Sequence, residues 1–78
     1  MAKSNIVYQY FKKEDKDHTI FIQFDPTRLS GSKLIIESNG EMELEEMEFE
    51  SDLPRQLNSE GFVVANPLEF HILINGLQ

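Results

Sequence analysis

The sequence predicts a mainly β (α+β) protein: a small antiparallel sheet of five or six strands, open-barrel or sandwich-like, with one short helix near residues 53–60. Two observations indicate this class. Apolar and polar residues alternate in several segments with the period of two that half-buried strands require, and Asn39-Gly40 is a strong signal for a hairpin turn. Because the chain has 78 residues and no cysteine, we expect one small acidic domain over residues 1–78 whose core forms without disulfides.

Two strands are expected to form a first hairpin. Ile6–Phe11 is rich in β-branched and aromatic residues, which favour strands. Lys12–Asp17 predicts a charged turn, and His18–Phe24 predicts a second strand with three apolar side chains on one face: Ile20, Ile22 and Phe24. Pro26 ends this strand because proline lacks a ladder N–H. We expect Thr27–Ser32 to be a loop that is flexible around its Ser-Gly-Ser sequence.

A second hairpin is expected to join Lys33–Glu37 to the acidic segment that follows. A two-residue turn would set the apolar residues of this strand against glutamates, whereas a three-residue loop, Ser38–Gly40, avoids this. The longer loop gives the following pairs: Ile36 with Met42, Leu34 with Leu44, and Lys33 with Glu45. Because a one-residue slip moves every side chain to the opposite face, the apolar pattern selects this loop. We expect Gly40 to be left-handed in a G1 bulge.

The segment Glu41–Glu50 alternates apolar and acidic residues, but its phase inverts after Glu45. A β-bulge at Glu45-Glu46 would correct the phase, because a bulge sets two residues opposite one. Four apolar side chains would then be buried on one face: Met42, Leu44, Met47 and Phe49. Six glutamates would share the solvent face: Glu41, Glu43, Glu45, Glu46, Glu48 and Glu50.

The last third of the chain predicts one helix and leaves a second segment ambiguous. Asp52–Gly61 has a capping residue at its start, a proline in its first turn and a glycine at its end, so we expect the short helix there. An extended Phe62–Val64 follows. Asn66 and Pro67 are also helix-start signals, but a helix after them would be apolar on two sides. We therefore favour a strand over residues 67–75 and keep the helix as the alternative.

The distribution of charge restricts the classes of partner. The net charge is −7, and residues 40–78 hold nine acidic side chains and one basic one. Direct binding to nucleic-acid phosphates is therefore not expected, nor is membrane insertion. With no signal-peptide pattern, we expect a cytoplasmic protein. The sequence has neither a nucleophile-elbow context nor a phosphate-binding fingerprint, so we expect no enzymatic activity and no catalytic residues, metal or cofactor.

Three hypotheses for the function remain open. The first is a non-catalytic accessory or regulatory protein that contacts a partner with a basic surface through the glutamate face of Glu41–Glu50. The second is a small-molecule binder, or a homo-oligomer, whose groove or interface is formed by aromatic residues of the first hairpin: Tyr8, Tyr10, Phe11 and Phe21. The third is a nucleic-acid mimic whose row of carboxylates would occupy the basic cleft of a DNA-binding protein.

Overall fold

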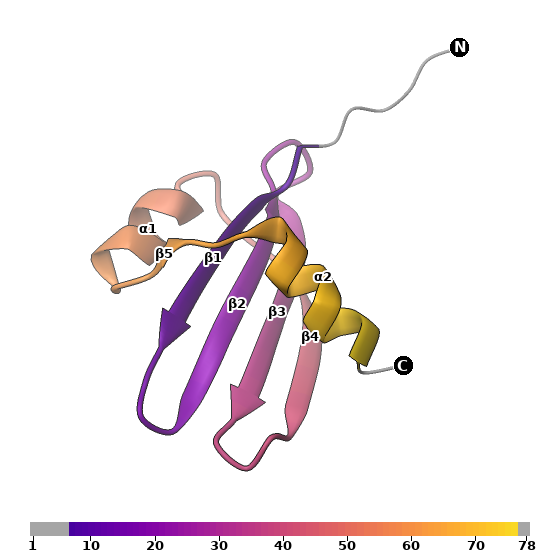
Figure 1. The fold of residues 1–78 in the computed structure, drawn as a ribbon. Coiled ribbons are helices and arrows are strands. Elements are labelled where there is room, and N and C mark those ends of the chain that lie inside the picture. The colour runs from indigo at the N-terminus through magenta and orange to yellow at the C-terminus, as the bar shows by residue number, and fades with distance from the viewer. Residues whose placement is uncertain (1–6, 77–78) are drawn as a thin grey trace.

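The computed structural model describes residues 7–76, which form a five-stranded sheet and two helices (Figure 1). In chain order the elements are β1 (Gln9–Glu14), β2 (His18–Asp25), β3 (Ser30–Glu37), β4 (Met42–Glu48), α1 (Leu53–Ser59), β5 (Val63–Val64) and α2 (Pro67–Gly76). The sheet is open and antiparallel, with the strand order β4-β3-β2-β1-β5. The predicted mainly β class and the predicted short helix near residues 53–60 are confirmed.

The two helices pack against opposite faces of the sheet. After β4 the chain forms α1 on one face, adds β5 beside β1, and returns across the other face as α2 (Figure 1). The α1 cluster consists of Phe11, Ile22, Phe24, Leu53, Leu57 and Phe62. The α2 cluster consists of Tyr10, Phe21, Leu34, Ala65 and Phe70. Alternate residues of each strand therefore point to an α1 face and an α2 face. Neither helix in the described part of the chain is long and apolar enough to cross a membrane.

The first hairpin lies further along the chain than predicted. β1 begins at Gln9 and includes Lys12–Glu14, which we expected in the turn. Ile6, the first residue of the predicted strand, lies outside the described residues. Lysines fit a covered strand because their stems can lie along apolar surface while the ammonium group stays near water. Both lysines lie over aromatic rings: Lys12 Nζ is 5.8 Å from the centre of Phe21, and Lys13 Nζ is 5.9 Å from the centre of Phe62.

The predicted loop Thr27–Ser32 is wrong in its second half, because β3 begins at Ser30. Gly31 lies within the ladder, opposite Phe24 of β2. A Cβ atom at Gly31 would lie 1.8 Å from the carbonyl oxygen of Gln23. Only glycine permits so close an approach of the two backbones. The glycine that we interpreted as a sign of flexibility is a packing requirement.

The second hairpin forms in the predicted register. The paired residues are Ile36 with Met42, Leu34 with Leu44, and Lys33 with Glu45. Gly40 has a φ of 94°, and its N–H donates to the carbonyl of Glu37 at 2.9 Å. The N–H of Glu37 donates to the carbonyl of Glu41 at 2.7 Å. These bonds describe a type I turn followed by a left-handed glycine, which is the predicted loop.

Helix α1 ends in the glycine motif that the sequence indicates. Gly61 has a φ of 98°, and its N–H donates to the carbonyl of Asn58 at 3.1 Å. The N–H of Phe62 donates to the carbonyl of Leu57 at 2.9 Å. Together these are the two bonds of a Schellman motif. Because Phe62 and Leu57 belong to the α1 cluster, the motif also anchors the end of the helix in the core.

The prediction of a strand over residues 67–75 is wrong, because this segment is helix α2. Its capping signals operate: Asn66 Oδ1 accepts a hydrogen bond from the N–H of Leu68 at 2.9 Å, and Pro67 occupies the first helical position. Both sides of the helix are apolar, as we expected of this alternative: Phe70, Leu73 and Ile74 pack on the sheet, while Leu68 and Ile72 are 65% and 64% exposed. The helix is favoured because the apolar α2 face needs a covering layer, which one more strand would not supply.

Candidate functional site

Strand β4 forms an exposed edge of the sheet. It pairs with β3 on one side, and within residues 7–76 no strand pairs with its other side. Six of its seven residues are exposed, the exception being Met42. The strand at the opposite edge, β5, has only two residues. The longest unpaired edge of the sheet is therefore the outer side of β4.

The pairing of β4 with β3 is continuous, so the predicted bulge at Glu45-Glu46 is wrong. The register runs without interruption from Ile36 opposite Met42 to Ser30 opposite Glu48. Consequently the residues on the α2 face are Met42, Leu44, Glu46 and Glu48, and those on the α1 face are Glu43, Glu45 and Met47. The apolar residues that we expected on one face are divided between two.

The positions of the helices explain why the inverted phase needs no bulge. On the α2 face, the covered end of the hairpin lies near the β3–β4 loop, where Ile36 and Met42 pack against the α2 cluster. On the α1 face, the covered end lies past the other end of β4, where the ring centre of Phe49 is 5.9 Å from that of Phe24. On the α2 face, β3 also changes from apolar to polar residues along its length, with Ser32 opposite Glu46 and Ser30 opposite Glu48. The covered part of the sheet therefore lies on the α2 face at one end of this segment and on the α1 face at the other, and the apolar residues lie on the covered face at each end.

The six glutamates predicted to bind a partner therefore do not form one face. All six are exposed: Glu43 and Glu45 on the α1 face, Glu46 and Glu48 on the α2 face, and Glu41 and Glu50 flanking the strand. The ion pairs found within residues 7–76 involve other carboxylates, and Lys33, although opposite Glu45, forms none with it. The edge thus carries negative charge that the described part of the chain leaves unneutralised.

Alternate residues of β4 direct their backbone groups away from the sheet. In an antiparallel ladder, hydrogen-bonded pairs alternate with pairs that are not hydrogen-bonded. At one end of this ladder Glu37 is bonded to Glu41, and at the other the N–H of Phe49 donates to the carbonyl of Leu29 at 2.8 Å. These bonded residues all have odd numbers, so the odd-numbered residues of β4 face β3. The backbone N–H and C=O groups of the even-numbered residues point outward: Met42, Leu44, Glu46 and Glu48.

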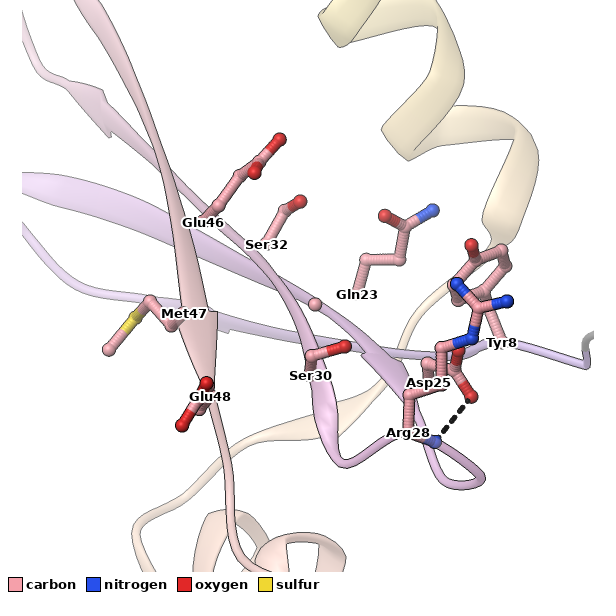
Figure 2. Close-up of a pocket in the computed structure, with 10 residues that line it drawn as sticks. Tyr8, Gln23, Asp25, Arg28, Ser30, Ser32, Glu46, Met47 and Glu48 are labelled. Atoms are coloured by element: carbon pink, nitrogen blue, oxygen red, sulfur yellow. Dashed lines mark hydrogen bonds between the residues drawn. The ribbon is translucent and has the colours of Figure 1, made fainter.

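A polar groove of about 550 Å³ adjoins β4 on the α2 face (Figure 2). Three strands line it, through Gln23 and Asp25 of β2, Ser30 and Ser32 of β3, and Glu46 and Glu48 of β4. Asp25 is only 3% exposed, and its Oδ1 accepts hydrogen bonds from the N–H groups of Thr27 at 2.9 Å and Arg28 at 3.2 Å. With three carboxylates and the single guanidinium of Arg28, the groove suits a cationic group.

Sequence reasoning missed this groove because it assigned Ser30 and Ser32 to a flexible loop. The signal was the presence of polar residues at alternate positions of two neighbouring strands, which places them on one face. Within residues 7–76, no three carboxylate or histidine side chains are placed to hold a metal ion together.

The four aromatic residues predicted to form a ligand groove do not share one surface. Tyr10 and Phe21 are buried beneath α2, whereas Phe11 is buried beneath α1. Tyr8 is 39% exposed, and its ring centre lies 6.3 Å from that of Tyr10. Tyr8, Tyr10 and Phe11 do line an apolar groove of about 480 Å³ at the β5 edge, together with Pro67, but Phe21 is not part of it.

Comparisons with known proteins found no matching family model, no matching curated protein and no matching solved structure. The fold and the site define a class, a small mainly β protein with an open acidic sheet edge.

Proposed function

We propose that this protein is a non-catalytic accessory or regulatory protein, and that it acts by docking an extended basic segment of a partner protein on the edge of β4. The observation that carries the proposal is the unpaired edge itself, where four residues present both backbone groups outward between exposed glutamates. Extended peptides bind such edges as added strands. Backbone hydrogen bonds then supply affinity, and the alternate side-chain positions supply specificity.

The charge of β4 favours a basic strand and disfavours a second copy of this chain. Two copies paired through β4 would set glutamates beside glutamates, and like charges directly opposite each other destabilise a strand pair. Edge charges of this kind keep sheets from joining one another. A strand with lysine or arginine beside the same glutamates forms opposite-charge pairs instead. The net charge of −7 also accelerates the encounter with a basic partner.

Hydrogen exchange measured by NMR tests the docking geometry on the intact protein. The probe is a basic heptapeptide, Lys-Val-Lys-Lys-Val-Lys-Val. With the peptide bound, exchange should slow at the four amides that point outward: Met42, Leu44, Glu46 and Glu48. The amides of Glu43, Glu45 and Met47 already bond to β3 and serve as the internal control. Chemical-shift changes without slower exchange at the four outward amides would indicate unspecific charge attraction and contradict strand addition.

A charge variant tests whether these particular glutamates attract the peptide. Glu43→Gln, Glu46→Gln and Glu48→Gln in one protein should weaken binding about tenfold at low salt, since each opposite-charge pair contributes roughly 0.2–1 kcal/mol. The dependence of binding on salt should also become shallower. The matched control changes the net charge equally at exposed positions outside β4, by Glu14→Gln, Asp17→Asn and Glu60→Gln. Equal weakening in both proteins would assign the effect to net charge and contradict a role for β4.

A second candidate function is small-molecule binding in the apolar groove at the β5 edge. Its volume of about 480 Å³ and its lining by Tyr8, Tyr10 and Phe11 support this candidate. A ligand there should bind almost independently of salt and leave exchange at β4 unchanged. Nucleic-acid mimicry would require one continuous row of carboxylates, and the division of the glutamates between two faces does not support it.

A further inference from the structure

We infer that β4 selects a partner strand by the order of the acidic and apolar side chains along β4. In the matching partner strand, the basic residues lie on one face in the first half and on the other face in the second half, and the apolar residues do the reverse. The inference rests on the proposed docking at β4 and specifies the chemistry of the partner. Its basis is the phase inversion of β4 combined with an uninterrupted register. Because no bulge corrects the inversion, each face of the open edge offers two kinds of position.

On the α2 face, the side chains of β4 are apolar in the first half of the strand and acidic in the second half. Leu44 is 43% exposed, although Leu34, its neighbour on β3, is completely buried. Leu44 therefore has apolar surface available to a further strand. Glu46 and Glu48 follow along the same face, beside the groove that holds the buried carboxylate of Asp25 (Figure 2). A partner strand meets apolar surface at one end of this face and the carboxylates of Glu46 and Glu48 at the other.

On the α1 face, the order is reversed. Glu43 and Glu45 are exposed and have no ion-pair partner within residues 7–76. Met47 follows, with 37% of its surface exposed, and Figure 2 shows its side chain on the side of the strand opposite to Glu46. Phe49 continues this apolar end into the α1 cluster. A partner strand therefore meets carboxylates first and apolar surface second.

The complementary antiparallel strand has a definite pattern. Read from the residue opposite Glu48 to the residue opposite Met42, it is basic, apolar, basic, basic, apolar, basic, apolar. The two adjacent basic residues lie opposite Glu46 and Glu45, and so on different faces. A strand that alternates strictly cannot match, because any register that suits one half of β4 sets the wrong residue type against the other half.

The inference is tested by comparing two peptides of equal composition. Lys-Val-Lys-Lys-Val-Lys-Val matches both faces of β4, whereas Lys-Val-Lys-Val-Lys-Val-Lys matches only one half in any register. The first should bind about tenfold more tightly in NMR titrations, because the second loses about three favourable side-chain pairs of roughly 0.2–1 kcal/mol each. Equal affinity, with slower exchange of the outward amides in both cases, would overturn the pattern and leave the docking intact. If neither peptide slows those amides, the docking itself is overturned.

A reciprocal variant gives an independent test of the same pattern. Glu46→Met together with Met47→Glu preserves the composition and net charge of β4 but removes the phase inversion at its middle. The strictly alternating peptide should then bind more tightly than the phase-inverted one. Dispersion of the amide NMR spectrum shows that the variant is folded. A folded variant that keeps the preference of the natural sequence would overturn the inference.

Discussion

Two glycines are required in this chain for different physical reasons. Gly40 has a φ of 94°, and nothing lies within 4 Å of the position that a Cβ would occupy. Glycine is required at position 40 for its backbone conformation alone, since residues that carry a side chain rarely adopt this left-handed φ. At Gly31 the difficulty is steric, because a Cβ would meet the carbonyl oxygen of Gln23. A substitution at Gly31 must therefore move the backbone of β2 or β3.

The left-handed conformation of Gly40 leads to the first prediction. Gly40→Val should lower the free energy of unfolding by about 1–3 kcal/mol through backbone strain. Chemical denaturation monitored by circular dichroism measures this change. Gly76→Ala is the control, because nothing lies within 4 Å of its Cβ position and its φ is not left-handed. Equal costs at the two positions would contradict the explanation by φ.

Asp52 supplies a pH-dependent contact at the start of α1. The side-chain hydrogen bond from Arg55 Nη2, at 2.8 Å, lowers the pKa of Asp52 below its usual value of 3.8, and a bond from the Gln56 side chain adds to this effect. Because the pKa is lower in the folded state, the stabilisation is present above pH 3.8 and is lost as the pH falls through the lowered value. Arg55→Gln should raise the pKa of Asp52 toward 3.8, measured by NMR titration of its carboxyl carbon. An unchanged pKa would exclude Arg55 as the cause.

At the scale of the element, β4 shows where sequence reasoning succeeds and where it fails. Its register was predictable, because loop length and the pairing of Ile36 with Met42 left one solution. The bulge prediction was wrong because it assumed a single covered face. Which face is covered near Met42 and which near Phe49 depends on α2 and α1, which come later in the chain. The division of the glutamates between the faces follows from the same cause.

The second half of the acidic segment provides a prediction that distinguishes its two apolar residues. Phe49→Ala should cost about 2–4 kcal/mol, because the ring packs edge-on against Phe24 in the α1 cluster. Met47→Ala should cost less than about 1 kcal/mol, because Met47 is exposed at the open edge. Thermal unfolding of both variants measures the difference. Similar large costs would indicate that both residues are buried, as the bulge required.

Helix α2 can be distinguished from the strand that we first favoured by a pair of substitutions. In a strand Phe70 and Ile72 would share a face, but in the helix Phe70 is 3% exposed and Ile72 is 64% exposed. Phe70→Ala should therefore cost about 3–5 kcal/mol, and Ile72→Ala less than about 1 kcal/mol. Both are measured by chemical denaturation. Comparable costs at the two positions would contradict the helix.

At the scale of the whole molecule, the uneven charge should affect stability. The exposed glutamates of β4 repel one another and make no ion pair within residues 7–76. The triple glutamine variant at positions 43, 46 and 48 should therefore have the same Tm as the natural sequence or a slightly higher one at low salt. Added salt should reduce the difference, because it screens the repulsion. A clearly lower Tm would show that these carboxylates make stabilising contacts.

The sequence by itself determined the features that depend on neighbouring residues: the β2 strand, the three-residue loop with its left-handed Gly40, and the glycine-terminated α1. The hydrogen bonds of the loop and of the helix end join groups only a few positions apart, and β2 is indicated by the alternation of its own residues, so local residue chemistry suffices. The tertiary structure decided the helical state of α2, the strand at Ser30–Ser32 and the distribution of the glutamates over two faces. Each of these depends on apolar residues distant in the chain, such as Phe49 and Phe70, which cover different parts of the two faces of the sheet.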